Sequence, residues 1–298
     1  IARRWGTSAC PGKRAGCGAA PRVHLCRMPN LIARLLSPPP VVAVLPLAGM
    51  IAPRAAVFGR QPLAVETLGP AISRAFSVRR LAGVALVVNS PGGSAAQSAL
   101  IAARIRQHAE EKKVPVTAFV EDVAASGGYW LACAADEILC LETSILGSIG
   151  VITTGFGFAG LMERIGVERR LYTAGEKKSL LDPFRPTREE DVARLRGIQE
   201  ALHARFKAWV RERRGAKLKA DEAELFSGEF WAGERAVALG LADGIGELRA
   251  TMRARHGERV RFAVFGRQRR GWWSRFLPTP EGLIAAAEER AAWARFGL

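Results

Sequence analysis

The sequence predicts an α/β fold in which a parallel sheet is covered by helices. Short runs of β-branched residues end at turn residues, which is typical of strands buried in a parallel sheet. Segments with apolar residues at helical spacing alternate with these runs along the chain. The length of 298 residues, 49% of them hydrophobic, allows one large α/β domain or two modest ones. In such folds, active groups lie on the loops at the carboxyl ends of the strands.

The alternation is clearest in the first half of the chain. Runs of apolar and β-branched residues predict four strands, at residues 41–45, 84–88, 116–120 and 137–141. Helices are predicted between them at residues 95–113, where Ile101 and Ile105 fall near one face, and at residues 126–135.

The alternation continues after Gly150. Apolar residues at helical spacing predict helices around residues 158–165, over 187–214, and in two short pieces at 222–226 and 234–239. Strands are predicted at residues 167–172 and 260–265, and an alanine-rich helix is expected after Pro280. The sequence contains no internal repeat.

Three parts are expected along the chain. Residues 1–40 are a basic extension without periodicity, which we expect to be disordered, and residues 41–266 form the main domain. Residues 267–298 combine a basic, aromatic stretch with a terminal helix. Residues 1–27 are either a basic arm or sequence upstream of a true start at Met28. The second interpretation is favoured because isoleucine is not a normal first residue.

The net charge of +16 raises the question of an anionic partner. Much of the excess lies before Glu66, the first acidic residue, and a second basic cluster near the C-terminus carries Trp272, Trp273 and Phe276. No nucleic-acid partner is expected, because the sequence has no nucleic-acid-binding motif. A solvated basic face is the favoured interpretation, and peripheral contact of residues 267–276 with anionic lipid is the alternative.

The sequence has no convincing membrane span. The apolar run at residues 41–53 is about half the length of the ~20 residues that a spanning helix needs, and Pro46 interrupts it. The pattern of a signal peptide is also missing. We therefore expect no transmembrane segment and a cytoplasmic location.

Cysteine and histidine give no sign of a metal or cofactor site. The five cysteines have no paired CxxC spacing, which argues against a zinc site and against a disulfide framework. The four histidines lie in no metal-binding or triad-like motif, and each is expected to be a surface or packing residue. We expect neither a metal nor a cofactor.

Three segments contain residue types that carry chemistry. The first is Asn-Ser-Pro-Gly-Gly-Ser at residues 89–94, between a predicted strand and a predicted helix. Its glycines let the backbone approach a ligand with exposed N–H groups, as in an oxyanion site or a phosphate loop. The spacing is not that of the known phosphate-binding motifs. A purely structural turn explains the glycines equally well.

The second segment places Ser126 at the start of a helix among small residues. Its hydroxyl would be accessible near the positive end of the helix, where developing negative charge is stabilised. From residue types alone, a helix cap is the favoured interpretation.

The third segment is Thr-Ala-Gly-Glu-Lys-Lys-Ser at residues 173–179. A lysine acts as a base only in its neutral form, which burial favours, and two exposed loop lysines are the commoner meaning of such a pair.

Together these segments resemble the signal peptide peptidase A and SohB family of serine peptidases. The similarity comprises, in order, the Pro-Gly-Gly loop, the Ser-Gly-Gly-Tyr helix start, Gly-Ser-Ile-Gly-Val at residues 147–151, and Gly-x-x-Lys-Ser ending at Ser179. It covers residues 41–246 and implies a ClpP/crotonase-like fold of repeated ββα units in a short, single-domain form. Residues 41–266 would then be a serine peptidase domain.

The resemblance implies a role for each residue of the site. Ser126 would be the nucleophile and Lys178 the general base, and the hydroxyl of Ser148 would orient the lysine. The backbone N–H groups of Gly93 and Gly127 would form the oxyanion hole. A Ser-Lys dyad needs no histidine, metal or cofactor.

The resemblance also implies partners. The family assembles its dyad between neighbouring domains or subunits, which for a single-domain chain implies a ring-like homo-oligomer; Lys177 would then face solvent. Peptides are the implied substrates, with apolar peptides such as signal-peptide remnants the expected class. The alternative function is a crotonase-like acyl-CoA enzyme, which would bind CoA and would not need Ser126.

Overall fold

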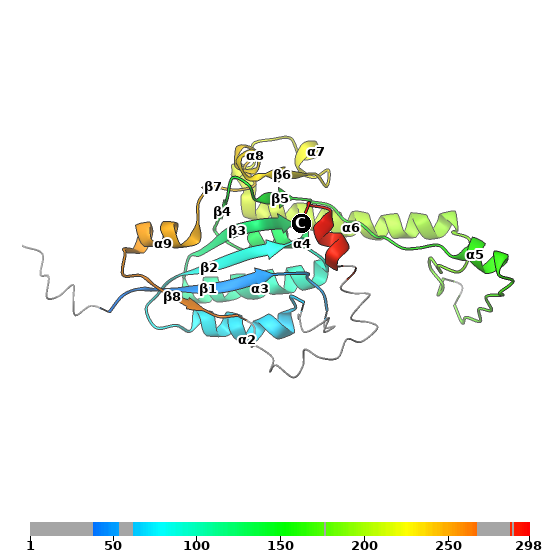
Figure 1. Cartoon of the computed structure of the whole chain (residues 1–298), viewed down its shortest axis with the longest axis horizontal. Helices are drawn as coiled ribbons and strands as arrows, with labels where there is room; N and C mark the ends of the chain where they lie inside the picture. Colours follow the sequence, from blue (N-terminus) through cyan, green and yellow to red (C-terminus); the bar gives the residue numbers. More distant parts are fainter. Residues whose placement is uncertain (1–37, 54–61, 176, 267–286, 288) are drawn as a thin grey trace, which may run out of the picture. The chain divides into compact units, whose positions relative to one another are not determined.

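One sheet organises the part of the chain that the computed structural model describes, which comprises residues 38–53, 62–175, 177–266, 287 and 289–298. Within these residues the strand order is β6-β5-β3-β2-β1-β8, and β4 and β7 extend from β3 as a side branch (Figure 1). Every pairing is parallel except that of β5 with β6. The strands are β1 (Val41–Ala48), β2 (Leu81–Ser90), β3 (Val116–Ala125), β4 (Glu137–Cys140), β5 (Ile145–Gly147), β6 (Phe230–Ala232), β7 (Gly244–Ile245) and β8 (Arg261–Val264).

Helices cover both faces of this sheet, so the predicted α/β class is confirmed. The described helices are α2 (Val65–Phe76), α3 (Ala95–Lys112), α4 (Gly127–Ala132), α5 (Ala159–Arg164), α6 (Glu189–Arg214), α7 (Glu222–Leu225), α8 (Gly233–Ala238) and α9 (Leu248–His256). The main core lies between one face of the sheet and α2, α3 and α4, where Leu86 and Ile101 are fully buried. A smaller cluster on the other face joins Phe119 of β3 to Met252 of α9.

The alternation of side chains explains why the continuous apolar runs form central strands. In β1, Leu45 packs into the main core and Val44 into the smaller cluster on the opposite face, so both faces of the strand are buried. Pro46 interrupts the apolar run but not the sheet. It lies beyond Val44, the last residue of β1 that pairs with β8, so its missing N–H costs no bond to that strand.

Several elements differ from the sequence prediction. The strand predicted at residues 167–172 is wrong: within the described residues this segment pairs with no other strand, and its side chains are largely exposed. The backbone N–H and C=O groups of a strand must bond to a partner strand, and an apolar sequence pattern does not show that such a partner is present. β3 continues five residues past the predicted end, to Ala125, and so delivers Ser126 directly. The helix α2 was not predicted, because Gly69 and Pro70 within it are typical turn residues.

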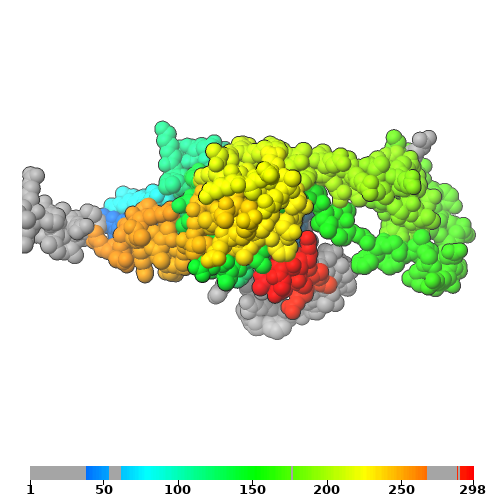
Figure 2. All heavy atoms as spheres, turned by 90° about the horizontal axis from the view of Figure 1, so that it is seen from above, coloured from blue at the N-terminus to red at the C-terminus, as the bar shows by residue number. Residues whose placement is uncertain are grey.

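Residues 154–175 and 177–190 lie away from the sheet (Figure 1). α5 and its flanking segments lie beside the amino-terminal end of α6, whereas the carboxyl-terminal part of α6 packs on α4 (Figures 1 and 2). α5 has no buried residue. No helix in the described ranges has both the length and the apolar character that crossing a membrane requires. The predicted extension at residues 1–40 lies outside the described residues up to Ser37, as does the basic stretch at residues 267–276.

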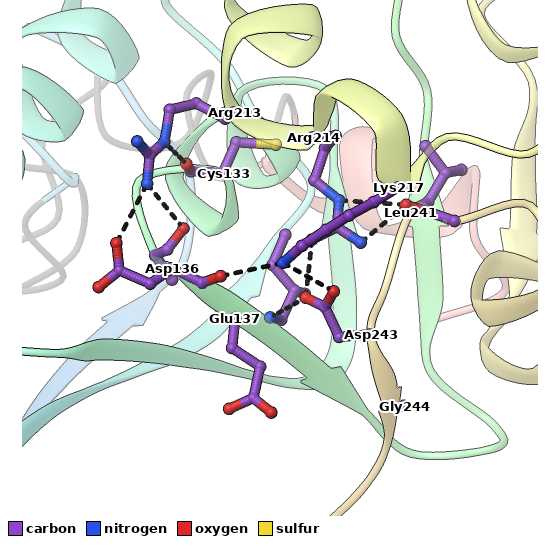
Figure 3. A network of polar contacts seen from close by, with 12 residues as sticks. Cys133, Asp136, Glu137, Arg213, Arg214, Lys217, Leu241, Asp243 and Gly244 are labelled. Carbon is purple, nitrogen blue, oxygen red and sulfur yellow. Dashed lines mark hydrogen bonds and ion pairs between the residues drawn. The ribbon is translucent and has the colours of Figure 1, made fainter.

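A partly buried polar network joins the end of α6 to the start of β4 (Figure 3). Arg214, at the end of α6, donates to the carboxylate of Asp243 over 2.7 Å and to the carbonyl of Gly240. The same carboxylate accepts the N–H of Ile138 at the start of β4. Burial alone raises the pKa of Asp243, but the hydrogen bonds outweigh burial and leave this pKa below its ordinary value.

We expect Arg214→Met to destabilise the protein by about 1 to 3 kcal/mol, since it leaves the carbonyl of Gly240 without its buried donor and removes one partner of Asp243. Lys217 still pairs with the Asp243 carboxylate, at 2.9 Å. Urea unfolding would measure the change. Arg211→Met is the matched control, because Arg211 pairs with Glu222 on the surface and should change little. Because the folded pKa of Asp243 is lowered, its contribution is complete above the unfolded pKa and disappears as the pH falls through the folded pKa. Equal losses in the two variants would contradict this account.

Candidate active site

Two adjacent parallel strands bring Ser126 and Ser148 together. Ala125 at the end of β3 pairs with Gly147 at the end of β5, and each serine follows directly. The N–H of Ser126 donates to the carbonyl of Gly147 over 2.9 Å. The two hydroxyl-bearing residues therefore lie at the carboxyl edge of the sheet, where the parallel arrangement predicts active groups.

The backbone of Ser126 adopts a conformation that few residues other than glycine tolerate. Its φ is 52° and its ψ is −119°, at the turn from β3 into α4. Strain of this kind is concentrated at functional sites, and a strained strand-to-helix turn is the geometry that exposes a nucleophilic serine. The hydroxyl makes no capping hydrogen bond to α4, so the helix-cap interpretation is wrong.

The loop after β2 lies in close contact with this turn. A Cβ atom added to Gly92 would lie 2.9 Å from the backbone nitrogen of Gly127 and 2.9 Å from the Cβ of Ser126. A Cβ added to Gly93 would overlap with the carbonyl oxygen of Ile51. These two positions must be glycine because a side chain would overlap with the neighbouring backbone. This requirement is stricter than the flexibility that a turn needs.

This contact places two backbone N–H groups beside Ser126. A Cβ on Gly127 would lie 3.3 Å from the nitrogen of Gly93, which shows how near the two residues are. Among the described residues, neither the N–H of Gly93 nor that of Gly127 donates to a protein acceptor. Paired donors next to a hydroxyl, at the amino end of a helix, can stabilise a negatively charged oxygen.

A cavity of about 620 Å³ opens beside these residues. Ser126, Ser148, Gly93 and Gly127 all line it. Its other walls come from distant parts of the chain and include the apolar side chains of Trp130, Val151, Ile152, Leu202 and Phe206. Such a cavity can hold an apolar segment of a peptide.

Lys178 is the one predicted site residue that the structure does not bring to this cavity. Its side chain is exposed, it does not line the cavity, and its N–H donates to the carbonyl of Gly175 over 3.2 Å within a turn. The turn belongs to the segment between α5 and α6, which lies away from α4 (Figure 1). One chain therefore assembles Ser126, Ser148 and the two glycines without the lysine.

Sequence reasoning missed other residues of the cavity. His203 of α6, expected to be a surface or packing residue, lines the cavity, and its Nε2 lies 3.0 Å from the carbonyl oxygen of Ile149. Arg295 reaches the cavity from the C-terminal segment. Neither residue lies in a local motif. Only the packing of remote elements brings them to Ser126.

Comparison with known proteins identifies a family. Residues 108–260 match peptidase family S49. A protein of Enterococcus faecium named as a candidate signal peptide peptidase SppA is 36% identical over 166 residues, which are 55% of this chain and 47% of that protein. The chloroplastic serine protease SPPA of Arabidopsis thaliana is 35% identical over 162 residues, which are 54% of this chain and 24% of that protein.

Another relative carries a different name. A protein of Brucella abortus (strain 2308) named Na(+)/H(+) antiporter NhaA is 44% identical over 256 residues, which are 80% of this chain. The match covers 34% of that protein, so the chain spans about a third of its length, and less than half the length of the two SppA-named proteins. The name of that protein refers to its whole length. It therefore does not establish the function of the third that this chain matches.

The family match, by contrast, covers much of the cavity, while the Pro-Gly-Gly loop and the C-terminal segment lie outside it. It includes β3, α4, β5, the lysine-bearing turn and α6, and it confirms the ClpP/crotonase-like α/β fold class. The match does not support the acyl-CoA enzyme that the fold alone would allow. By its sequence match and its fold, this chain belongs to peptidase family S49, a family of serine peptidases that includes the SppA and SohB proteins.

Proposed function

We propose that this chain hydrolyses peptide bonds with Ser126 as nucleophile and Lys178 as general base. The observation that supports this most directly is the strained turn at Ser126, beside the N–H groups of Gly93 and Gly127. Residues 41–266 would form the peptidase domain, which agrees with a family match at residues 108–260.

Each residue has a definite task in this mechanism. Lys178 accepts the proton of the Ser126 hydroxyl while Oγ attacks the peptide carbonyl carbon. The negatively charged oxygen of the tetrahedral intermediate accepts hydrogen bonds from the N–H groups of Gly93 and Gly127. The lysine returns the proton to the leaving amine, and a water molecule, activated by the same lysine, then hydrolyses the acyl-enzyme. The hydroxyl of Ser148 orients the lysine amine.

The base would come from a neighbouring subunit of a ring-like homo-oligomer. In a single chain, Lys178 is exposed and remote from the cavity, and solvent favours the charged form of a lysine. Burial between subunits would favour the neutral form that a base requires. The part of the chain between β5 and α6, which carries Lys178, also exposes large apolar side chains, including Ile152 (65% exposed), Phe156 (81%) and Tyr172 (89%). Apolar patches of this kind are typical of surfaces that pack against another chain.

The proposed substrates are apolar peptides such as signal-peptide remnants. The apolar walls of the cavity, which include Trp130, Ile152 and Phe206, favour this class. Peripheral contact with anionic lipid through residues 267–276 would bring the chain near such peptides, although this stretch lies outside the described residues.

A direct test separates this function from the acyl-CoA alternative. The protein should hydrolyse a fluorogenic peptide of apolar and small residues, and calorimetry with CoA should show no binding. Binding of CoA together with an absence of peptide hydrolysis would overturn the proposal.

A mixing experiment tests the shared active site. Chains with Ser126→Ala retain Lys178, and chains with Lys178→Ala retain Ser126, so a mixed oligomer contains some complete sites. We expect each variant alone to be inactive and their mixture to recover part of the wild-type hydrolysis after subunit exchange. Exchange would be verified by energy transfer between labelled chains. Verified exchange without recovery would contradict assembly of the site between subunits.

A further inference from the structure

The cavity beside Ser126 has an uneven distribution of charge. Among its described lining residues, the ionisable side chains are those of His203 and Arg295, and none is a carboxylate. The remaining described lining residues are uncharged. A bound peptide would therefore meet a cationic group with no carboxylate of the described lining competing for it, and an anionic group on the peptide is its natural complement.

The C-terminal segment packs on the strand that delivers the nucleophile, and this packing positions Arg295. The adjacent Phe296 is buried, with 9% of its surface exposed, in an apolar cluster with Ala125 at the end of β3. The ring of Phe296 also lies edge-on to that of Phe230 in β6, with the ring centres 5.1 Å apart. Figure 1 shows the C-terminal helix, in red, beside α4 and the sheet. Arg295 and Ser126 are thus both held by the end of β3.

The side chain of Arg295 is suited to bind a carboxylate. Its guanidinium carbon lies 6.0 Å from the centre of the Phe296 ring, and the residue is exposed on the cavity side. Stacking near an aromatic ring limits the freedom of a guanidinium and leaves its N–H edge available. A guanidinium binds the two oxygens of a carboxylate through two parallel hydrogen bonds.

We propose that Arg295 is a specificity-determining residue that binds a carboxylate of the peptide substrate. The inference rests on the proposed function, because it takes the Ser126 cavity as the peptide-binding site. The carboxylate is either that of an acidic side chain or the free C-terminus of the peptide. Both present the same pair of oxygens, so the chemistry of recognition is shared.

Four matched fluorogenic peptides test the proposal and distinguish the two sources. They share one apolar sequence, end in a carboxylate or a carboxamide, and carry Glu or Gln at one internal position. We expect the wild type to prefer one of the two charged forms over its neutral partner by about 10-fold in kcat/KM, the size of a modest charge-assisted hydrogen bond. In Arg295→Gln this ratio should fall to near one, and in Arg295→Lys it should be intermediate.

Arg290→Gln provides the matched control. Arg290 is exposed and precedes Arg295 by five residues in the same segment, but it does not line the cavity. It should keep the wild-type ratio. A preference that is absent from the wild type, or that survives in Arg295→Gln, would overturn the proposal.

Peptide binding to Ser126→Ala chains gives a second readout that needs no turnover. Fluorescence anisotropy should show the same charge preference, and adding Arg295→Gln to this variant should remove it. If Ser126→Ala still hydrolyses the peptides, the proposed function fails. If it is inactive but binds all four peptides equally, only the role of Arg295 fails.

Discussion

Ser126→Ala is expected to lower kcat/KM for peptide hydrolysis by at least about 10³-fold, because it removes the atom that attacks the carbonyl. The fold should survive. Alanine occupies the same backbone conformation, φ 52°, with the same strain as serine, and the side chain makes no hydrogen bond to another described residue. The variant should therefore match the wild type in urea unfolding. A fluorophosphonate that labels nucleophilic serines should modify the wild type and leave the variant unlabelled.

Ser126→Gly separates catalysis from backbone strain. Glycine adopts positive φ at little cost, whereas the strain at a serine in such a region amounts to about 1 to 3 kcal/mol. We expect this variant to be inactive and at least as stable as the wild type. Ser77→Ala, at an exposed hydroxyl that bonds only to Ser73 within its own helix end, should change neither property. An active Ser126→Ala or Ser126→Gly enzyme would refute the role of Ser126.

The sequence predicted the scaffold of the site better than its local geometry. The strands that lead to Ser126 and to the Pro-Gly-Gly loop follow from runs rich in apolar and β-branched residues, which are typical of strands buried on both faces. The conformation of Ser126 does not follow from its neighbours. Small residues around a serine at a helix start fit a cap as well as a nucleophile, and only the positive φ and the missing cap bond distinguish the two.

Residue types alone also do not determine the role of the Pro-Gly-Gly loop. A turn and an oxyanion site both call for glycine, so residue type cannot choose between them. The decisive fact is the approach of Gly92 to the turn of Ser126, and that approach depends on the pairing of β2 with β3. For a related reason, the sequence does not predict that His203 and Arg295 line the cavity. Each lies in an ordinary segment, and tertiary packing alone brings it to the cavity.

The prediction of a strand at residues 167–172 is wrong because a strand needs a partner strand, and the sequence of one segment does not show whether a partner lies beside it. The segment reads Val-Glu-Arg-Arg-Leu-Tyr, with apolar residues only at its two ends, and no described strand of the same chain lies beside it. Val167 remains 48% exposed and Tyr172 89% exposed.

The exposed segment between α5 and α6 also carries Lys178, the proposed general base. Lys178→Ala is expected to lower kcat/KM by about 10² to 10⁴-fold, the usual contribution of a general base. Lys178→Arg should be equally inactive, since a guanidinium stays protonated in proteins and cannot accept the proton of Ser126. The measurement is peptide hydrolysis at concentrations where the oligomeric state, followed by sedimentation, matches that of the wild type.

Lys177→Ala is the sharpest control that the chain offers for this prediction. Lys177 and Lys178 are neighbours in one turn, both are exposed, and they carry the same charge, so their replacement changes the electrostatics of the segment equally. Only Lys178 occupies the position before Ser179 that the proposed function assigns to the base. Lys177→Ala should therefore retain activity within a few-fold of the wild type. Equal losses in the two variants would show that the segment needs its charge or its subunit contacts, and would remove the reason to regard Lys178 as the base.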